Sequence, residues 1–183
     1  VIDEKGVYSI EKFLVSRRIM YWQVYLHKTV VSAEFLLINI LKKAKQLALS
    51  GTELFCSPAL HEFLYHQHNR DSFTTSPELL GTFAELDDYD ILSAIKVWVK
   101  HPDYVLSTLC KWLINRNLYK LELSNLPIQL EKIEDLRKKF KETLKISEED
   151  IHLFVFTDSI QNSAYNPNKN GIKILYKNGH VVD

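Results

Sequence analysis

SIEKFLVSRRIMYWQVYLHKT, residues 9–29, opens a long helical pattern. Ser9 can cap a helix, Glu11 falls in its first turn, and neither glycine nor proline follows before Gly51. The sequence therefore predicts one helix over about residues 9–50, roughly 60 Å long. Because its apolar residues lie on more than one face, we expect this helix to run through a helical core.

Three shorter helices are expected next, and each has a recognisable start. Ser57-Pro58 combines a capping serine with a proline at the first helical position. Asp87 or Asp88 opens the second helix, and Pro102 starts the third. With the first helix, they predict a helical body.

A change of composition near residue 121 begins a smaller region. Pro127 starts an amphipathic helix there, and two strand-like stretches follow at residues 152–157 and 172–176. The pair Asn178-Gly179 is typical of a tight turn between strands. The tail is therefore predicted to be an α+β unit.

The expected fold is mainly α-helical and has two parts. We place a helical domain at residues 1–120 and a small α+β subdomain at residues 121–183. The chain does not begin with Met and stops inside an apparent strand. We therefore expect it to be a fragment of a longer protein, with the second part truncated.

The charge balance argues against a strongly charged partner. The chain carries 23 Lys and Arg against 23 Asp and Glu, so we expect neither nucleic-acid binding nor attraction to an acidic membrane. No apolar run reaches the ~20 residues of a membrane span, and no signal peptide is recognisable. Cys56 and Cys110 are expected to be free thiols of a cytoplasmic protein.

Motifs for a self-contained active site are missing. The five glycines form no phosphate-binding loop, and there is no Cys-x-x-Cys pair. His61 and His66 resemble the histidines of a zinc-protease helix, but they are five residues apart, which separates them around a helix. We therefore expect His61, His66 and His68 to be histidines on a polar face or histidines with their hydrogen bonds satisfied, and no metal to be bound by this stretch.

One face of the first helix combines cations with phenol rings. Arg17, Tyr21, Tyr25 and Lys28 lie within about 80° of one another at ~100° per residue. Arginine offers a planar fork to phosphate oxygens, lysine a point charge, and tyrosine a flat ring with a hydroxyl tip. This face suits a phosphorylated ligand that carries a ring. The alternative is a helix surface that covers its neighbours with amphipathic side chains, and periodicity alone favours that alternative.

Residues 9–29 strongly resemble the bacterial HD-domain phosphohydrolases related to deoxynucleoside triphosphate (dNTP) triphosphohydrolases. They are more distantly similar to the eukaryotic sterile-alpha-motif/HD-domain enzyme. Three further stretches share the likeness: ELDDYD at 85–90, NRNLYK at 115–120, and the tail from 152 to 176. The resemblance implies the helical C-terminal half of an HD-domain fold. It also implies a parent enzyme that hydrolyses dNTPs to deoxynucleoside and triphosphate and assembles as a dimer or tetramer.

A divalent metal is part of what the resemblance implies, but its ligands are not in this sequence. The family holds the ion with a His…His-Asp…Asp set, whereas no histidine here is followed by aspartate. We therefore expect the metal ligands to lie outside this chain, with no catalytic residue within it and no activity from this stretch alone.

The resemblance also implies roles for side chains that contact the substrate. Arg17 is similar to an arginine that grips substrate phosphates, and Tyr25 to a tyrosine packed against the deoxyribose. Tyr21 stands where the eukaryotic branch has a histidine, so we expect it to line the pocket rather than to transfer protons.

Two further pairs resemble contacts to an effector nucleotide. His27 and Lys28 are similar to a His-Lys pair at a subunit contact, and Arg116 and Lys120 match a second phosphate-binding pair. The alternative for Arg116 and Lys120 is a basic helix C-terminus that the helix dipole stabilises.

Two other functions remain open. One is hydrolysis of a different phosphoester by an HD-family enzyme, which a substrate panel separates from dNTP hydrolysis. The other is a non-catalytic nucleotide-binding or oligomerisation module, which is the favoured function if the chain is complete.

Overall fold

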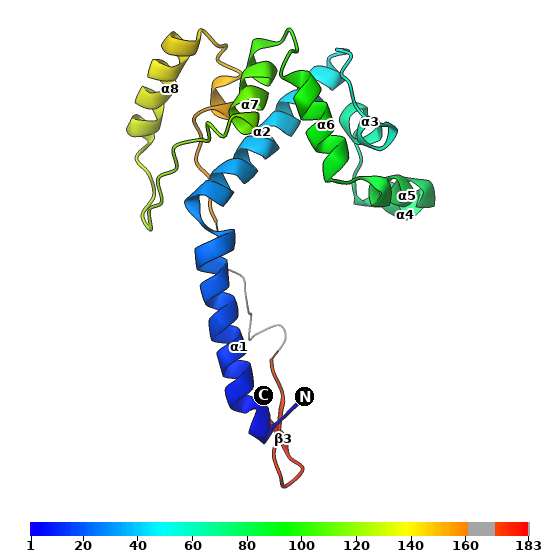
Figure 1. Ribbon diagram of the computed structural model, residues 1–183, viewed down its shortest axis with the longest axis vertical. Coiled ribbons are helices and arrows are strands. Elements are labelled where there is room, and N and C mark those ends of the chain that lie inside the picture. The colour runs from blue at the N-terminus through cyan, green and yellow to red at the C-terminus, as the bar shows by residue number, and fades with distance from the viewer. Residues whose placement is uncertain (161–170, 183) are drawn as a thin grey trace. The chain divides into compact units, whose positions relative to one another are not determined.

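The computed structural model describes residues 1–160 and 171–182, and its regular elements are mostly helices (Figure 1). In chain order the elements are β1 (Ile2–Asp3), η1 (Glu4–Gly6), α1 (Val7–Met20), η2 (Tyr21–Tyr25), α2 (Lys28–Leu49), α3 (Pro58–Tyr65), α4 (Arg70–Thr75), α5 (Pro77–Glu85), α6 (Asp88–Trp98), α7 (Tyr104–Ile114), α8 (Leu130–Leu144), η3 (Ile151–Leu153), β2 (Ile174–Leu175) and β3 (Val181–Val182). The expectation of a mainly α-helical fold is confirmed. Among the described residues, no single helix is both long enough and apolar enough to cross a membrane.

The chain packs as two compact units. Unit 1 comprises residues 1–31 together with the residues described from 157 onward, and unit 2 comprises residues 32–156. These units are groups of residues that pack together, and their limits differ from the expected boundary at residue 121. The proposed domains at 1–120 and 121–183 stay a prediction.

The core of unit 2 lies among α2, α3, α6 and α7, with η3 closing one side (Figure 1). Its largest fully buried side chains are those of Trp98, Leu36, Ile40, Ile95, Leu106 and Leu109. The indole N–H of Trp98 donates to the carbonyl oxygen of Phe55 at 3.0 Å. The one polar atom of this buried ring is therefore satisfied.

The helices of unit 2 begin at capped residues. Ser57 Oγ accepts the N–H of Leu60 at the start of α3, and Asp87 caps α6 in a reciprocal capping box. These two starts agree with the sequence prediction. α7 starts after Pro102 rather than at it, because the carboxylate of Asp103 accepts the N–H of Leu106 and provides the cap.

The prediction of a single helix over residues 9–50 is wrong. In η2, a π-helical turn, the Leu26 N–H bonds to the Tyr21 carbonyl oxygen at 2.8 Å, one residue further back than in an α-helix. His27 Nδ1 then accepts the Thr29 N–H at 3.3 Å and caps α2. A cap of this kind needs neither glycine nor proline, so their absence did not reveal the break. α1 has no buried residue, and the expected helical core is formed only by the α2 part.

The two strand predictions for the tail have different outcomes. Residues 152–157 form no strand: the chain makes the 3₁₀ turn η3 there, with Leu153 and Phe154 buried in the core of unit 2. Periodicity alone does not separate a short apolar strand from a buried turn. The predicted hairpin is confirmed, since β2 pairs antiparallel with β3 across the turn at Gly179, which has a φ of +81°. β1 pairs parallel with β2, a long-range contact that the sequence did not predict.

Candidate functional site

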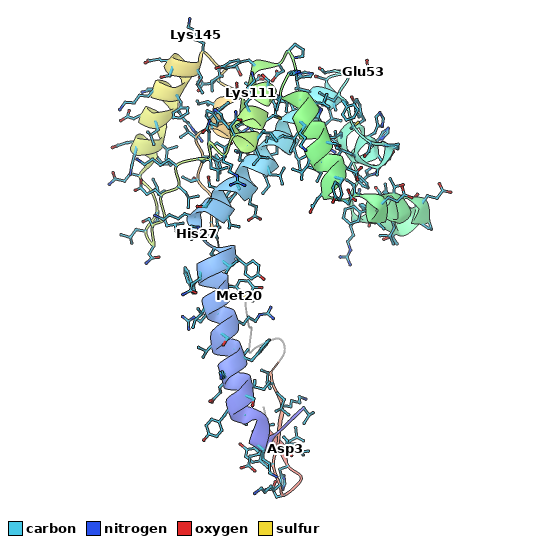
Figure 2. All side chains as sticks on the ribbon, viewed as in Figure 1. Asp3, Met20, His27, Glu53, Lys111 and Lys145 are labelled. Atoms are coloured by element: carbon cyan, nitrogen blue, oxygen red, sulfur yellow. The ribbon has the colours of Figure 1, made fainter. Side chains whose placement is uncertain are left out.

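Arg17, Tyr21 and Tyr25 line one shallow groove in unit 1, on α1 and η2. The groove has a volume of about 310 Å³ and is completed by Phe13, Ser16 and Met20. Figure 2 labels Met20 on the groove and His27 just beyond it in the chain. The structure therefore brings together the three residues for which the sequence predicts a substrate-contacting role.

The guanidinium of Arg17 lies over the ring of Tyr21. Its carbon Cζ is 5.5 Å from the ring centroid, and Nη2 is 3.5 Å from the Tyr21 hydroxyl. The Nε of Arg17 is shielded from solvent and has no hydrogen-bond partner within the described residues. No carboxylate within the described part of the chain forms an ion pair with Arg17. Its positive charge is thus oriented by a ring and available to an anion.

The π-helical turn η2 carries both phenol rings of the groove. The ring centroids of Tyr21 and Tyr25 are 5.0 Å apart, with the planes tilted by 55°. Tyr25 is about half exposed, so a ligand can reach its ring face. Single π-helical turns inside helices are frequent at functional sites. The arrangement offers a cation and two rings to one ligand.

His27 and Lys28 are both exposed at the junction between η2 and α2. Because Nδ1 of His27 accepts the N–H of Thr29, the Nε2 atom carries the hydrogen of the neutral ring and can donate to a ligand. This contact gives His27 a structural role as a helix cap. Their role in binding an effector stays a prediction.

Arg116 is exposed and lies just beyond α7 in the left-handed region, with a φ of 58°. Two backbone bonds close the helix around it: the Asn117 N–H donates to the Trp112 carbonyl oxygen at 2.8 Å, and the Arg116 N–H to that of Leu113 at 3.2 Å. These are the two bonds of a Schellman motif, in which the left-handed position is usually occupied by glycine. An arginine at this position carries backbone strain.

Replacing Arg116 with glycine is expected to raise the free energy of unfolding by roughly 0.5–1 kcal/mol, because glycine adopts this conformation without a steric cost. Thermal unfolding of the wild type and the variant measures the change. Arg116→Ala, which keeps the strain and removes the charge, is the control. A lower melting temperature for Arg116→Gly than for Arg116→Ala would contradict this account.

Tyr119, next to Lys120, anchors the segment after α7 to the core of unit 2. Its hydroxyl donates to the Leu153 carbonyl oxygen at 2.6 Å and accepts from Asn39 Nδ2 at 3.3 Å. Its own carbonyl oxygen accepts from Ser32 Oγ at 2.8 Å. Burial raises the pKa of Tyr119 to about 12, from an ordinary value of 10.0. The side chain of Lys120 is exposed, and its proposed effector contact stays a prediction.

The variant Tyr119→Phe is expected to lose about 1–2 kcal/mol of stability at neutral pH, since the two hydrogen bonds of the buried hydroxyl disappear. Because the folded pKa lies above the unfolded one, the wild-type contribution is fully present below pH 10 and is lost as the pH rises toward 12. Urea unfolding at neutral and alkaline pH should therefore show a steeper alkaline loss in the wild type. Equal alkaline slopes would refute the raised pKa.

A second group of side chains meets at the end of α3. Glu62, His66 and His68 place their potential ligand atoms within 4.8 Å of one another. The sequence prediction compared only the spacing of His61 and His66, which are five residues apart, and so did not identify this group. The signal that could have found it is Glu62 four residues before His66, which puts both on one helix face.

Comparison with known proteins relates the chain to a phosphohydrolase of known structure. No family model matches the chain. It is 34% identical over 142 residues to the uncharacterized protein YwfO of Bacillus subtilis (strain 168), an alignment that covers 78% of this chain and 31% of that protein. A phosphohydrolase from Bacteroides thetaiotaomicron VPI-5482, known from its crystal structure, is 49% identical with a TM-score of 0.89. This second match covers 100% of the chain and 45% of the phosphohydrolase.

The chain thus spans less than half of either protein. The structural match extends over both units of this chain and combines high sequence identity with a close backbone fit. The chain has a phosphohydrolase-type fold.

Proposed function

We propose that the full-length protein is a metal-dependent phosphohydrolase that converts dNTPs to deoxynucleoside and inorganic triphosphate. The observation that carries this proposal is the 49% identity with the Bacteroides phosphohydrolase over the whole chain. The groove around Arg17 supports a phosphorylated ligand, and the neighbouring phenol rings support one that carries a sugar and a base. The dNTP specificity rests on the resemblance of residues 9–29.

The role of this chain in the reaction is to bind and orient the substrate. The guanidinium of Arg17 would bind phosphate oxygens through charge-assisted hydrogen bonds. The exposed ring of Tyr25 would pack against the deoxyribose, where it leaves no room for a 2′-hydroxyl. Neither task requires a proton transfer, so no residue of this chain is proposed as catalytic.

The divalent metal of the proposed reaction is assigned to ligands outside this chain. No histidine of the sequence is followed by aspartate, so the residues present do not fit the His…His-Asp…Asp set. When bound, such an ion would activate water or polarise the α-phosphate. The chain's own residues would hold the triphosphate in place for that step.

Assembly and regulation are also proposed. We assign the protein to the cytoplasm as a homo-oligomer that contacts an effector nucleotide through His27, Lys28, Arg116 and Lys120. Light scattering with and without each dNTP measures the oligomeric state. A mass that stays that of a monomer under all conditions would contradict this assembly.

A substrate panel on the full-length protein tests the proposed reaction. Each dNTP, the matching ribonucleotides and simple phosphoesters are incubated with Mg²⁺ or Mn²⁺, and products are separated by ion-exchange chromatography. Triphosphate and deoxynucleoside in equal amounts are expected, with loss of activity in EDTA. Release of single phosphates would assign another phosphoester chemistry. Thermal stabilisation by dNTPs without turnover would leave a binding module.

A further inference from the structure

The cluster at the end of α3 has the dimensions of a metal site. Glu62 Oε1 is 3.0 Å from His68 Nε2, and Glu62 Oε2 is 3.3 Å from His66 Nδ1. Ligand atoms about 2.1 Å from a tetrahedral Zn²⁺ are ~3.4 Å apart. The three side chains therefore need only small rotations to share one ion.

The surrounding structure holds these side chains in place. The Lys45 ammonium donates to the carbonyl oxygens of Phe63 and His66, at 2.7 and 2.8 Å, and so fixes the end of α3. The backbone of His66 is extended, which turns the chain and returns His68 toward Glu62. The His68 ring packs edge-on against Phe63, with ring centroids 5.6 Å apart. The cluster is thus positioned by packing and backbone contacts as well as by charge.

His68 has an unsatisfied atom that faces the cluster. Its Nε2 is shielded from solvent and forms no hydrogen bond, although it lies 3.0 Å from a carboxylate oxygen of Glu62. A lone pair on this nitrogen that is directed at a shared ion would remove the cost of a buried, unpaired atom.

The donor set selects the class of ion. Two imidazole nitrogens and one carboxylate oxygen suit Zn²⁺ and its transition-metal neighbours, whereas Mg²⁺ and Ca²⁺ prefer oxygen ligands throughout. His66 is exposed, with 55% of its side chain accessible, so solvent can fill a fourth position. The C-terminal end of α3 also carries a partial negative charge that favours a cation.

We propose that Glu62, His66 and His68 bind a divalent transition-metal ion, Zn²⁺ above all. The ion clamps the segment between α3 and α4 that begins at His66. The expectation from the sequence that this stretch binds no metal is replaced by this proposal, because that expectation rested on the spacing of His61 and His66 and did not combine Glu62 with His66 and His68. The proposal does not depend on the proposed hydrolase activity.

Zinc titration of the metal-free, full-length protein tests the site. Calorimetry and elemental analysis measure the number of zinc ions bound per chain. The wild type is expected to bind one zinc ion more than His68→Ala or Glu62→Gln. Zn²⁺ at a hundredfold excess over its Kd should raise the wild-type Tm by about 3 °C, and this shift should disappear in both variants. Comparing variants removes any contribution from a metal bound elsewhere in the protein.

Three controls make the result decisive. His61 lies on the same helix, and its ring stacks on that of Tyr65 with centroids 4.2 Å apart. Because His61 is not a proposed ligand, the variant His61→Ala should keep the wild-type zinc stoichiometry. His68→Cys keeps a zinc-binding atom and should restore binding. Co²⁺ in place of Zn²⁺ should give the visible absorption of a four-coordinate nitrogen and oxygen site only when the cluster is intact. Equal zinc stoichiometry and equal Tm shifts in the wild type, His68→Ala and Glu62→Gln would overturn the proposal.

Discussion

Under the proposed reaction, Arg17→Ala in the full-length protein is expected to lower kcat/KM for the proposed nucleotide substrate by on the order of 100-fold, because hydrogen bonds to charged groups contribute about 1.5–3 kcal/mol each. Its Nε lacks a partner within the described residues and its guanidinium is oriented by the Tyr21 ring. No carboxylate in the described chain neutralises its charge, so an anionic ligand gains the full interaction. Steady-state kinetics on the substrate identified by the panel measure the loss.

Two variants separate the role of Arg17 from a general effect of charge. Arg18→Ala removes a neighbouring exposed cation that does not line the groove, and its kcat/KM should stay close to that of the wild type. Arg17→Lys keeps the charge without the planar fork, so an intermediate value is expected. Wild-type kinetics in Arg17→Ala would remove Arg17 from the substrate site.

Asp150→Ala is expected to lower the free energy of unfolding by about 3 kcal/mol, because it leaves a buried ammonium without its nearest partner. Lys43 is only 5% exposed, and its Nζ lies 2.7 Å from Asp150 Oδ1 and 3.7 Å from Asp103 Oδ2. Asp103 still compensates part of the Lys43 charge in the variant, so we expect the loss of stability to be no larger than this. Urea unfolding followed by the fluorescence of the tryptophans in unit 2 measures it.

An exposed ion pair and a double variant provide the comparison. Lys132 pairs with Glu122 at 2.8 Å, but both side chains are more than half exposed, so Lys132→Ala should change stability by less than about 1 kcal/mol. Lys43→Met combined with Asp150→Leu removes both charges and should recover most of the stability. Equal losses in Asp150→Ala and Lys132→Ala would contradict the importance of burial.

Much of the fold could be predicted from local chemistry. Ser57 and Asp87 cap helices where the sequence placed them, and Asn178-Gly179 makes the predicted turn. The break before α2 was missed because its cause is a side-chain nitrogen of His27 that bonds to the backbone. The 3₁₀ turn at Leu153 was missed because tertiary burial, not periodicity, decides the structure of so short a segment.

The candidate site could be predicted in part. Arg17, Tyr21 and Tyr25 are four residues apart, so helical geometry alone places them on one face, and the structure shows them on one groove. Their chemical roles stay predictions. Glu62, His66 and His68 could not be assembled from helical spacing, because His68 lies beyond the end of α3 and returns to Glu62 only through the turn that follows.

The parallel pairing of β1 with β2 has a consequence for the order of folding. Ile2 pairs with Ile174, so the sheet of unit 1 closes a loop that contains nearly all of the chain, and closing a long loop costs conformational entropy. Unit 2 is a continuous segment with its own core and can fold as soon as residue 156 has left the ribosome. Strand β1 is synthesised before unit 2 but must wait until its partner β2 has also been made. Unit 2 can therefore fold before the sheet of unit 1, which forms only after β2 has been synthesised.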